Sequence, residues 1–354
     1  MTDPAPPAPP PSGHAVSRWL HPLPAGLYCA AGDFYIDPRL PVSRAVITHG
    51  HADHARAGHG AVLATAETIA IMKVRYGPGS AGSFEALACG ERKRIGGVEV
   101  RLEPAGHILG SAQVVMEHRG MRAVVTGDYK RAADPTCAPF APVACDVLVT
   151  EATFGLPVFR HEPAAKEAAR LAASIRDQPE RTHLLGVYSL GKCQRMIALL
   201  RAQGYDAPIH LHGALVALTE LYQTLGIDLG DVRPVSGGGA AGKRGLREPL
   251  AGALVMCPPS ALADRWSQRF ADPVTVFASG WMRVRGRIRQ RGVELPLVVS
   301  DHADWPELIA TIEESEAEEV WVTHGREDAL VRQLTLMGRT GRALALVGFE
   351  DEAE

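Results

Sequence analysis

The chain has 354 residues, a formal net charge of −3, and 46% hydrophobic residues. That is enough apolar material for one large domain or two medium ones. A protein that binds nucleic acid through its overall electrostatic field would carry a net positive charge. Any nucleic-acid binding here must therefore come from local basic patches and bound metal. The chain contains no apolar run of 18 residues, so we expect no membrane span.

The proline-rich start of the chain predicts a disordered tail over residues 1–17. Residues 1–12 have neither the basic nor the apolar region of a signal peptide. The six cysteines form no CxxC pair, which predicts free thiols in a reducing cytoplasm. The fourteen histidines are bunched along the chain, and this is the first indication of metal chemistry.

Short apolar runs that are typical of strands dominate the first part of the chain. We expect strands within 26–37 and at 44–48, 98–102, 113–118, 121–126 and 146–150, and a helix over 65–76 with Thr65 as its N-cap. Several of these strands run directly into a polar residue. His49 directly follows the second of them and Glu151 the last, and Asp128 follows the fifth after Gly127.

After residue 154 the pattern changes to an alternation of helices and strands. We expect helices at 163–177 and 192–202 and strands at 182–188, 208–212, 252–257 and 274–278. Such alternation is typical of a parallel α/β layer. Two later runs, 297–300 and 320–323, are again strands that lead into histidine motifs. The sequence therefore predicts a segment inserted into a fold that resumes near the end.

The motif that decides the chemistry is His49-Gly-His51-Ala-Asp53-His54. In an extended chain, residues two apart point the same way, so His49 and His51 can bind one cation. We expect the chain then to turn into the start of a helix, where Asp53 and His54 can reach a second cation. Neutral imidazole and carboxylate suit zinc, with manganese or iron as alternatives.

Three further ligand-type residues follow predicted strands. They are His107, Asp128 and His324, and each has a glycine beside it, which allows close backbone approach. Strand ends on one rim of a sheet converge in space. We therefore expect these side chains to meet the histidine motif.

The order of these motifs resembles the metallo-β-lactamase superfamily. HxHxDH is followed by a glycine-flanked histidine and by Gly-Asp after an apolar strand. The inserted segment is similar to the β-CASP nuclease branch. The residues that carry this likeness are Glu151, the segment 188–194, the Asp-His-Ala-Asp motif at 301–304, and the final Thr-His-Gly around His324.

The resemblance covers residues 27–349, and residues 27–38 look most like bacterial ligase-associated DNA exonucleases. It implies an α/β fold, namely an αββα metallo-β-lactamase sandwich with an inserted α/β β-CASP cap. The expected division is a discontinuous metallo-β-lactamase domain, 18–154 and 296–350, and a cap domain, 155–295.

The resemblance also implies two divalent metal ions, zinc first and manganese as the alternative. The implied ligands of metal one are His49, His51 and His107, and those of metal two are Asp53, His54 and His324. Asp128 is the implied bridging ligand.

Other residues are implied to act around the metals. Asp37 would orient the histidine loop, with Asp33 as a weaker candidate, and Glu151 would support the site. His302, flanked by Asp301 and Asp304, resembles the acid that protonates the leaving group. A further metal ligand or a structural histidine are the alternatives for His302.

Two cations about 3.5–4 Å apart suit phosphodiester hydrolysis. An imidazole tuned near neutrality can protonate the leaving oxygen. The resemblance implies that Asp53, Glu151 and His302 are the catalytic residues.

Two segments are candidates for holding substrate. Ser189 and Lys192 lie where a helix begins, so they could bind a phosphate, although an ordinary strand-to-helix turn would look the same. Residues 281–291 read WMRVRGRIRQR. If this segment is extended, its arginines at 283, 285, 287, 289 and 291 form one cationic stripe; the alternative is an edge strand protected by charge.

A phosphate-binding P-loop is not expected at GGGAAGK, residues 237–243. The next residue is Arg244, where that loop needs serine or threonine. No strong apolar strand precedes the segment.

The resemblance to ligase-associated exonucleases favours a DNA exonuclease in repair, partnered with an ATP-dependent DNA ligase and a helicase. A ribonuclease that processes RNA ends is the alternative, because His324 resembles the RNA-cleaving side of the branch. A small-molecule hydrolase is disfavoured by the insertion and the arginines, and a non-catalytic scaffold by the intact ligand set.

Overall fold

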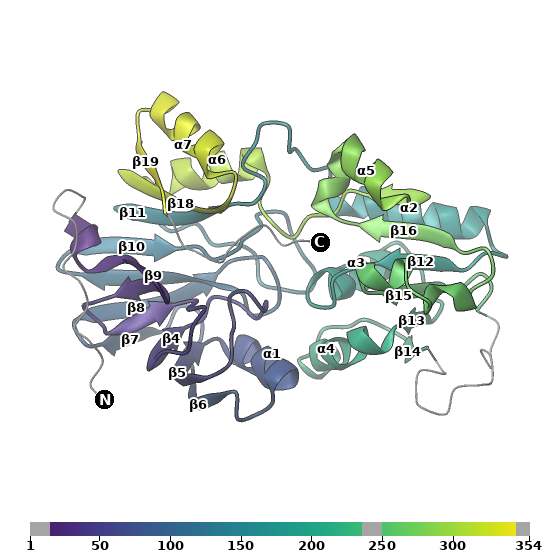
Figure 1. Cartoon of the computed structure of the whole chain (residues 1–354), viewed down its shortest axis with the longest axis horizontal. Coiled ribbons are helices and arrows are strands. Elements are labelled where there is room, and N and C mark those ends of the chain that lie inside the picture. The colour runs from purple at the N-terminus through teal and green to yellow at the C-terminus, as the bar shows by residue number, and fades with distance from the viewer. Residues whose placement is uncertain (1–14, 236–249, 345–354) are drawn as a thin grey trace.

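The computed structural model describes residues 15–235 and 250–344, whose strands form three sheets flanked by helices (Figure 1). Residues 1–14 of the expected tail, the P-loop-like residues 237–243, and residues 345–350 of the expected domain lie outside the described residues. Residues 15–17, which we assigned to the tail, belong instead to a 3-10 helix, η1 (Ala15–Arg18), in which Val16 is fully buried.

The first sheet has six strands in chain order. They are β1 (Leu20–Leu23), β2 (Gly26–Cys29), β3 (Phe34–Ile36), β4 (Arg44–Val46), β5 (His59–Ala64) and β6 (Ala81–Ala86). Helix α1 (Ala66–Tyr76) lies between β5 and β6 in the chain. Its N-cap is Thr65, as predicted, and the Thr65 hydroxyl accepts a hydrogen bond from the Thr68 N–H at 3.2 Å.

The second sheet has seven strands in the order β19-β18-β11-β10-β9-β8-β7. Their bounds are β7 (Arg92–Ile95), β8 (Val98–Pro104), β9 (Ala112–His118), β10 (Met121–Val125), β11 (Val147–Ala152), β18 (Glu319–Gly325) and β19 (Thr340–Ala343). The strands from β7 to β10 pair antiparallel, whereas β10, β11, β18 and β19 pair parallel.

The two sheets face each other across one apolar core, to which Phe34 of the first sheet and Met116 and Trp321 of the second belong. Ile69 and Met72 of α1 pack on the outer side of the first sheet. Helices α6 (Trp305–Glu314) and α7 (Glu327–Leu336) pack against the other side of the second sheet. The layers are therefore helix, sheet, sheet, helix, which is the predicted αββα sandwich.

The third sheet is all parallel and has the order β14-β13-β15-β12-β16-β17. Its strands are β12 (His183–Gly186), β13 (Ile209–Leu211), β14 (Val232–Pro234), β15 (Leu254–Cys257), β16 (Val274–Ala278) and β17 (Leu295–Leu297). The helices of this part are α2 (Ala164–Asp177), α3 (Lys192–Ala202), α4 (Gly213–Thr224), α5 (Arg285–Arg291), η2 (Pro259–Leu262), η3 (Ser267–Arg269) and η4 (Gly280–Arg283).

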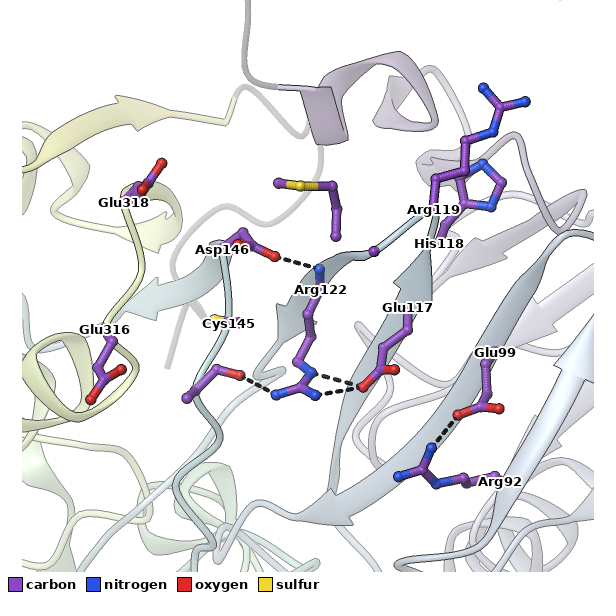
Figure 2. Close-up of a pocket in the computed structure, with 13 residues that line it drawn as sticks. Arg92, Glu99, Glu117, His118, Arg119, Arg122, Cys145, Asp146, Glu316 and Glu318 are labelled. Atoms are coloured by element: carbon purple, nitrogen blue, oxygen red, sulfur yellow. Dashed lines mark hydrogen bonds and ion pairs between the residues drawn. The ribbon is translucent and has the colours of Figure 1, made fainter.

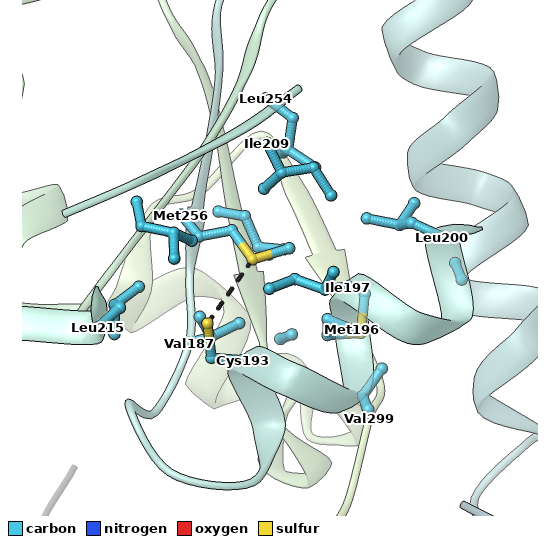
Figure 3. Packing of buried hydrophobic residues seen from close by; sticks show 14 of the residues in the cluster. Val187, Cys193, Met196, Ile197, Leu200, Ile209, Leu215, Leu254, Met256 and Val299 are labelled. Atoms are coloured by element: carbon cyan, nitrogen blue, oxygen red, sulfur yellow. Dashed lines mark hydrogen bonds between the residues drawn. The ribbon is translucent and has the colours of Figure 1, made fainter. Parts of the chain in front are cut away.

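All of these elements lie in the chain between β11 and β18, which are neighbours in the second sheet. We call β12 to β17 with α2 to α5 the inserted segment; it occupies the right side of Figure 1. Its α/β alternation is the one predicted. Figure 3 shows its core, where Met196 and Leu200 of α3 lie near Met256 of β15. The same core includes Ile71, Ile108 and Leu109 of the sandwich, so the two parts share apolar packing.

Three local predictions were wrong. Residues 281–291 are helical rather than extended, because Ser279 caps η4 and α5 runs on to a left-handed Gly292. The strand expected at 297–300 ends at Leu297. After His51 the chain makes one turn, in which the His54 and Ala55 N–H groups bond to the His51 carbonyl, and no helix begins before Ala66.

Two further observations concern the cysteines and the helices of the described residues. All six cysteines are free thiols. No helix among residues 15–235 and 250–344 is long and apolar enough to cross a membrane.

Candidate metal centre

The loop after β4 carries the histidine motif, and Asp37 fixes its shape. One Asp37 carboxylate oxygen accepts the Thr48 N–H at 2.8 Å. The other accepts the Thr48 hydroxyl at 2.5 Å and His54 Nδ1–H at 2.7 Å. Asp33, the weaker candidate for this role, has a side chain that is 74% exposed and accepts the Tyr28 hydroxyl instead. The geometry therefore favours Asp37 as the residue that orients the loop.

One group of ligand-type side chains combines three histidines with Asp128. Donor atoms of His49, His51, His107 and Asp128 all lie within 4.8 Å of one another. Asp128 Oδ2 is 3.4 Å from His49 Nε2 and 3.8 Å from His107 Nε2. These are the four residues implied for metal one and the bridging position.

A second group shares Asp128 with the first. His54, Asp128 and His324 again have donor atoms within 4.8 Å. His54 Nε2 is 3.4 Å from Asp128 Oδ2, and His324 Nδ1 is 3.6 Å from Asp128 Oδ1. Asp53 lies beside this group, with its Oδ2 3.6 Å from His54 Nε2. Asp128 is thus common to both groups, as a bridging carboxylate would be.

The hydrogen bonds of His51 and His107 test whether a cation fits here. His51 Nε2 lies 3.3 Å from the Leu190 carbonyl, and His107 Nδ1 lies 2.6 Å from the Asp301 carbonyl. A carbonyl can only accept, so both of these nitrogens carry hydrogen. The remaining nitrogens, His51 Nδ1 and His107 Nε2, face each other at 3.0 Å. Two facing lone pairs repel, and a shared cation removes the conflict.

The fully buried His49 supports the same conclusion. Its Nδ1 contacts the Thr48 hydroxyl at 3.0 Å, whereas its Nε2 is buried without a hydrogen-bond partner. Buried polar atoms are almost always satisfied. Zinc and related divalent ions bind carboxylates and imidazole nitrogens. The other nitrogen of such an imidazole ring typically bonds to a partner that orients the ring. The residues present therefore fit a metal centre.

Burial and neighbouring charges set the protonation of these groups. Burial, with His54 close by, holds the pKa of His49 well below its usual value, and burial next to His302 does the same for the pKa of His107. Burial opposes charge on His54 as well, but Asp128 and Asp53 outweigh it and raise the pKa of His54. His49 and His107 are therefore neutral and able to donate lone pairs.

Glu151 and His302 form a pair at the edge of the centre. Glu151 is fully buried at the end of β11. One of its carboxylate oxygens accepts the Tyr129 N–H at 2.7 Å, and the other lies 2.9 Å from His302 Nδ1. The His302 ring lies 4.7 Å from that of His107, centroid to centroid. Glu151 thus fixes the orientation of His302 beside the histidine cluster.

A pocket of about 300 Å³ opens next to the histidines. The sandwich and the inserted segment both line it, with His51, Ala52, Asp53, Arg75, His107, Tyr188, Ser189, Leu190, Lys192, Asp301 and His302. Ser189 and Lys192 therefore line the pocket beside the histidines, and their binding of substrate stays a prediction. Sequence reasoning missed Arg75 of α1 as a lining residue, because nothing in the local pattern marks it.

Glycine allows the two parts to approach at this pocket. Gly191, just before α3, has φ +84°, and a Cβ there would collide with Ile108 of the sandwich. Only glycine fits both the positive φ and the close contact. The turn that carries Ser189 and Lys192 can therefore lie directly against the loop that carries His107.

The five arginines at 283–291 do not form the predicted stripe. Because the segment is helical, residues two apart, such as Arg285 and Arg287, point to opposite sides. The Arg287 guanidinium lies over the Trp281 ring, 5.5 Å from its centroid. None of the five lines the pocket at the histidines.

A larger pocket, about 610 Å³, lies away from all predicted site residues (Figure 2). It is lined by charged side chains that pair with one another. Arg92 bonds to Glu99 at 2.6 Å, and Arg122 bonds to Glu117 at 2.8 Å. These two pairs balance part of the charge in its lining.

Comparisons with known proteins agree with this architecture. A probable DNA ligase of Opitutus terrae is 29% identical over 309 residues, which is 85% of this chain and 28% of that protein. A cleavage and polyadenylation specificity factor subunit 3 of Dictyostelium discoideum is 33% identical over 129 residues, 34% of this chain and 16% of that protein. A ribonuclease of Thermus thermophilus is 26% identical, covering 72% of this chain and 64% of that protein.

The chain thus spans less than a third of the length of the first two relatives. A crystal structure of a protein of unknown function from Enterococcus faecalis superposes with a TM-score of 0.53 at 13% identity, covering 79% of this chain and 74% of that one. No family model matches the chain.

The two-sheet sandwich with histidines and Asp128 gathered at its strand ends defines a metallo-β-lactamase-type protein. With the parallel α/β segment inserted between β11 and β18, the similarity to the relatives named above supports the β-CASP branch of that superfamily for this chain.

Proposed function

We propose that the chain is a nuclease that hydrolyses phosphodiester bonds with two divalent metal ions, and that it degrades DNA from an end during repair. The observation that carries the proposal is the sharing of Asp128 by two groups of histidines. Asp128 would be shared by two divalent ions, and a pair of such ions suits phosphodiester hydrolysis.

The proposed metal ligands are those implied by the sequence. His49, His51 and His107 would hold one ion and Asp53, His54 and His324 the other, with Asp128 between them. Zinc is the proposed ion and manganese the alternative, since the donors are imidazole and carboxylate. When bound, such a pair supplies positive charge that stabilises the phosphate oxygens as the bond breaks.

His302 is the proposed proton donor to the leaving oxygen. Its Nδ1 lies 2.9 Å from a Glu151 carboxylate oxygen, and an imidazole oriented in this way can act as a general acid. His302 also lines the pocket, within reach of a bound substrate. If it were a metal ligand instead, its loss would lower metal content as well as activity.

The inserted segment is proposed to act as a cap that binds the polynucleotide, with domain limits 18–154 and 296–350 for the sandwich and 155–295 for the cap. Ser189 and Lys192 line the pocket from the cap side and Arg75 from the sandwich side. Two cations from different elements suit a phosphate. Arg283, Arg285 and Arg287 remain proposed backbone contacts farther from the centre.

DNA is favoured as substrate because the probable DNA ligase aligns with 85% of this chain. The same match supports a DNA ligase as a working partner. A helicase is a further proposed partner, implied by the resemblance to ligase-associated exonucleases. RNA is the second candidate, because relatives named as a ribonuclease and as a cleavage and polyadenylation factor also align. His324 in the last motif also resembles the RNA-cleaving side of the branch.

The test uses end-labelled single- and double-stranded DNA beside RNA of the same sequence, with wild-type protein and the His51→Ala and Asp128→Ala variants. We expect wild-type protein to shorten DNA from an end. Both variants should fold, as judged by circular dichroism, and cleave nothing. RNA cleavage alone would replace DNA by RNA in the proposal, and activity in both variants would refute the two-metal site.

A further inference from the structure

Five charged side chains are buried together between α3 of the inserted segment and the loops of the metal centre. They are Lys130, Asp134, Lys192, Arg195 and Asp301, and we call them the buried ion network. The exposed fraction of each side chain is at most 6%. Charged residues are rarely buried to this degree unless they are paired. Their burial here requires an explanation beyond packing.

Arg195 of α3 lies at the middle of the network. Its Nε is 3.3 Å from Asp134 Oδ2. Its Nη1 donates to Asp301 Oδ1 at 3.0 Å and also to the Ser300 carbonyl. Arg195 therefore connects the inserted segment to two separate loops of the sandwich. In the loop before His302 it bonds to the Ser300 backbone carbonyl and to the Asp301 side chain.

The network reaches the metal centre through His107 from two directions. Lys130 bonds to Asp134 at 2.7 Å and donates from Nζ to the His107 carbonyl at 3.1 Å. The Asp301 carbonyl accepts His107 Nδ1–H at 2.6 Å. The backbone and the ring of His107 are thus both fixed by members of the network. Because Nδ1 is engaged, Nε2 faces the other histidines.

Apolar packing already joins the two parts through Ile71, Ile108 and Leu109. A buried ion network would be an inefficient way to hold the inserted segment to the sandwich, because apolar side chains in its place would stabilise the contact as well or better. What ion pairs and hydrogen bonds add is a defined geometry. The network therefore accounts for the orientation of the centre better than for the stability of the fold.

We propose that Arg195 is a positioning residue, which transmits the placement of α3 to His107 and His302 through Asp301 and Ser300. The proposal rests on the metal centre proposed above. It predicts that the inserted segment is required for metal binding as well as for holding substrate. Partners that orient metal-binding histidines typically change metal affinity by about 10- to 100-fold when removed.

The test compares Arg195→Met and Arg195→Lys with Arg201→Met. Arg201 lies in the same helix and donates to the carbonyls of Tyr205, Ala207 and Asp231. Arg201→Met is thus a matched control, because it removes an arginine that also makes several hydrogen bonds but lies outside the buried ion network. Zn²⁺ affinity is measured by competition with a chromophoric chelator, and kcat, KM and the melting temperature are measured beside it.

We expect Arg195→Met to lose about 10- to 100-fold in Zn²⁺ affinity, with a fall in kcat larger than the change in KM. Arg195→Lys should recover part of the affinity, because it keeps the charge but not the two-pronged contact. Arg201→Met should lower the melting temperature and leave Zn²⁺ affinity unchanged. If Arg195→Met does not fold, Arg195→Lys and Asp134→Asn decide the question by the same affinity measurement.

Wild-type Zn²⁺ affinity in a folded Arg195 variant would overturn the proposal. An equal loss of affinity in Arg201→Met would also overturn it, because the effect would then be general destabilisation. Failure of wild-type protein to bind any divalent metal would refute the metal centre itself, so the two failures are distinguishable.

Discussion

Replacing Asp37 by asparagine tests how the histidine loop is held. Asp37 accepts three hydrogen bonds, from the Thr48 N–H, the Thr48 hydroxyl and His54 Nδ1–H. An asparagine of the same shape has one oxygen that can accept and one NH₂ group that can only donate. At least one of the three donors, all of which lie in the loop, must therefore face another donor or turn away.

The magnitude follows from these contacts. A hydrogen bond to a charged group contributes about 1.5–3 kcal/mol, so Asp37→Asn should lower the free energy of unfolding by about 2–3 kcal/mol. Because His54 loses the partner that orients its ring, affinity for the second metal ion should fall by about 10- to 100-fold.

The assay combines urea unfolding of the metal-free protein with a Zn²⁺ titration. The control is Asp33→Asn, the same substitution four residues earlier, where the side chain is 74% exposed and accepts the Tyr28 hydroxyl. We expect the control to behave as wild type in both measurements. Unchanged Zn²⁺ affinity in Asp37→Asn, or an equal loss in Asp33→Asn, would refute the reasoning about the loop.

Three other predictions concern catalysis and substrate binding. His302→Asn should lower kcat by about 10²- to 10⁴-fold, as expected for a lost general acid, with metal content unchanged; loss of a metal ion would make it a ligand instead. Arg75→Ala and Lys192→Ala should each raise KM. Each should also reduce the slope of log binding affinity against log salt concentration by the amount expected for about one phosphate contact. An unchanged slope would remove that residue from the phosphate site. Arg285→Ala and Arg287→Ala should differ in their effect on DNA binding, because the helix points them to opposite sides; equal effects would contradict that geometry.

Much of the fold could be predicted because local pattern and final structure agree. The expected helix 192–202 and strand 274–278 match α3 and β16 residue for residue. The period-two pattern of 98–102 is the buried and half-buried alternation of β8. Ligand-type residues placed directly after strands were also informative, because parallel strand ends meet at one edge.

Other features depend on contacts that no local pattern encodes. Arginines at every second position of 281–291 look like one face of a strand, but arginine is a good helix former, and Ser279 and Gly292 bound the helical turns. Arg75 lines the pocket from α1, which packs against α4 of the inserted segment. Lys130, Asp134 and Arg195 gave no sign of burial, since charged residues are ordinarily exposed.

The central claim is tested most directly by elemental analysis of the active, unchelated protein, beside the Asp128→Ala variant. The account predicts two divalent transition-metal ions per chain in wild-type protein, and a loss of bound metal together with all cleavage in Asp128→Ala. Full nuclease activity in protein that holds no stoichiometric metal would contradict it.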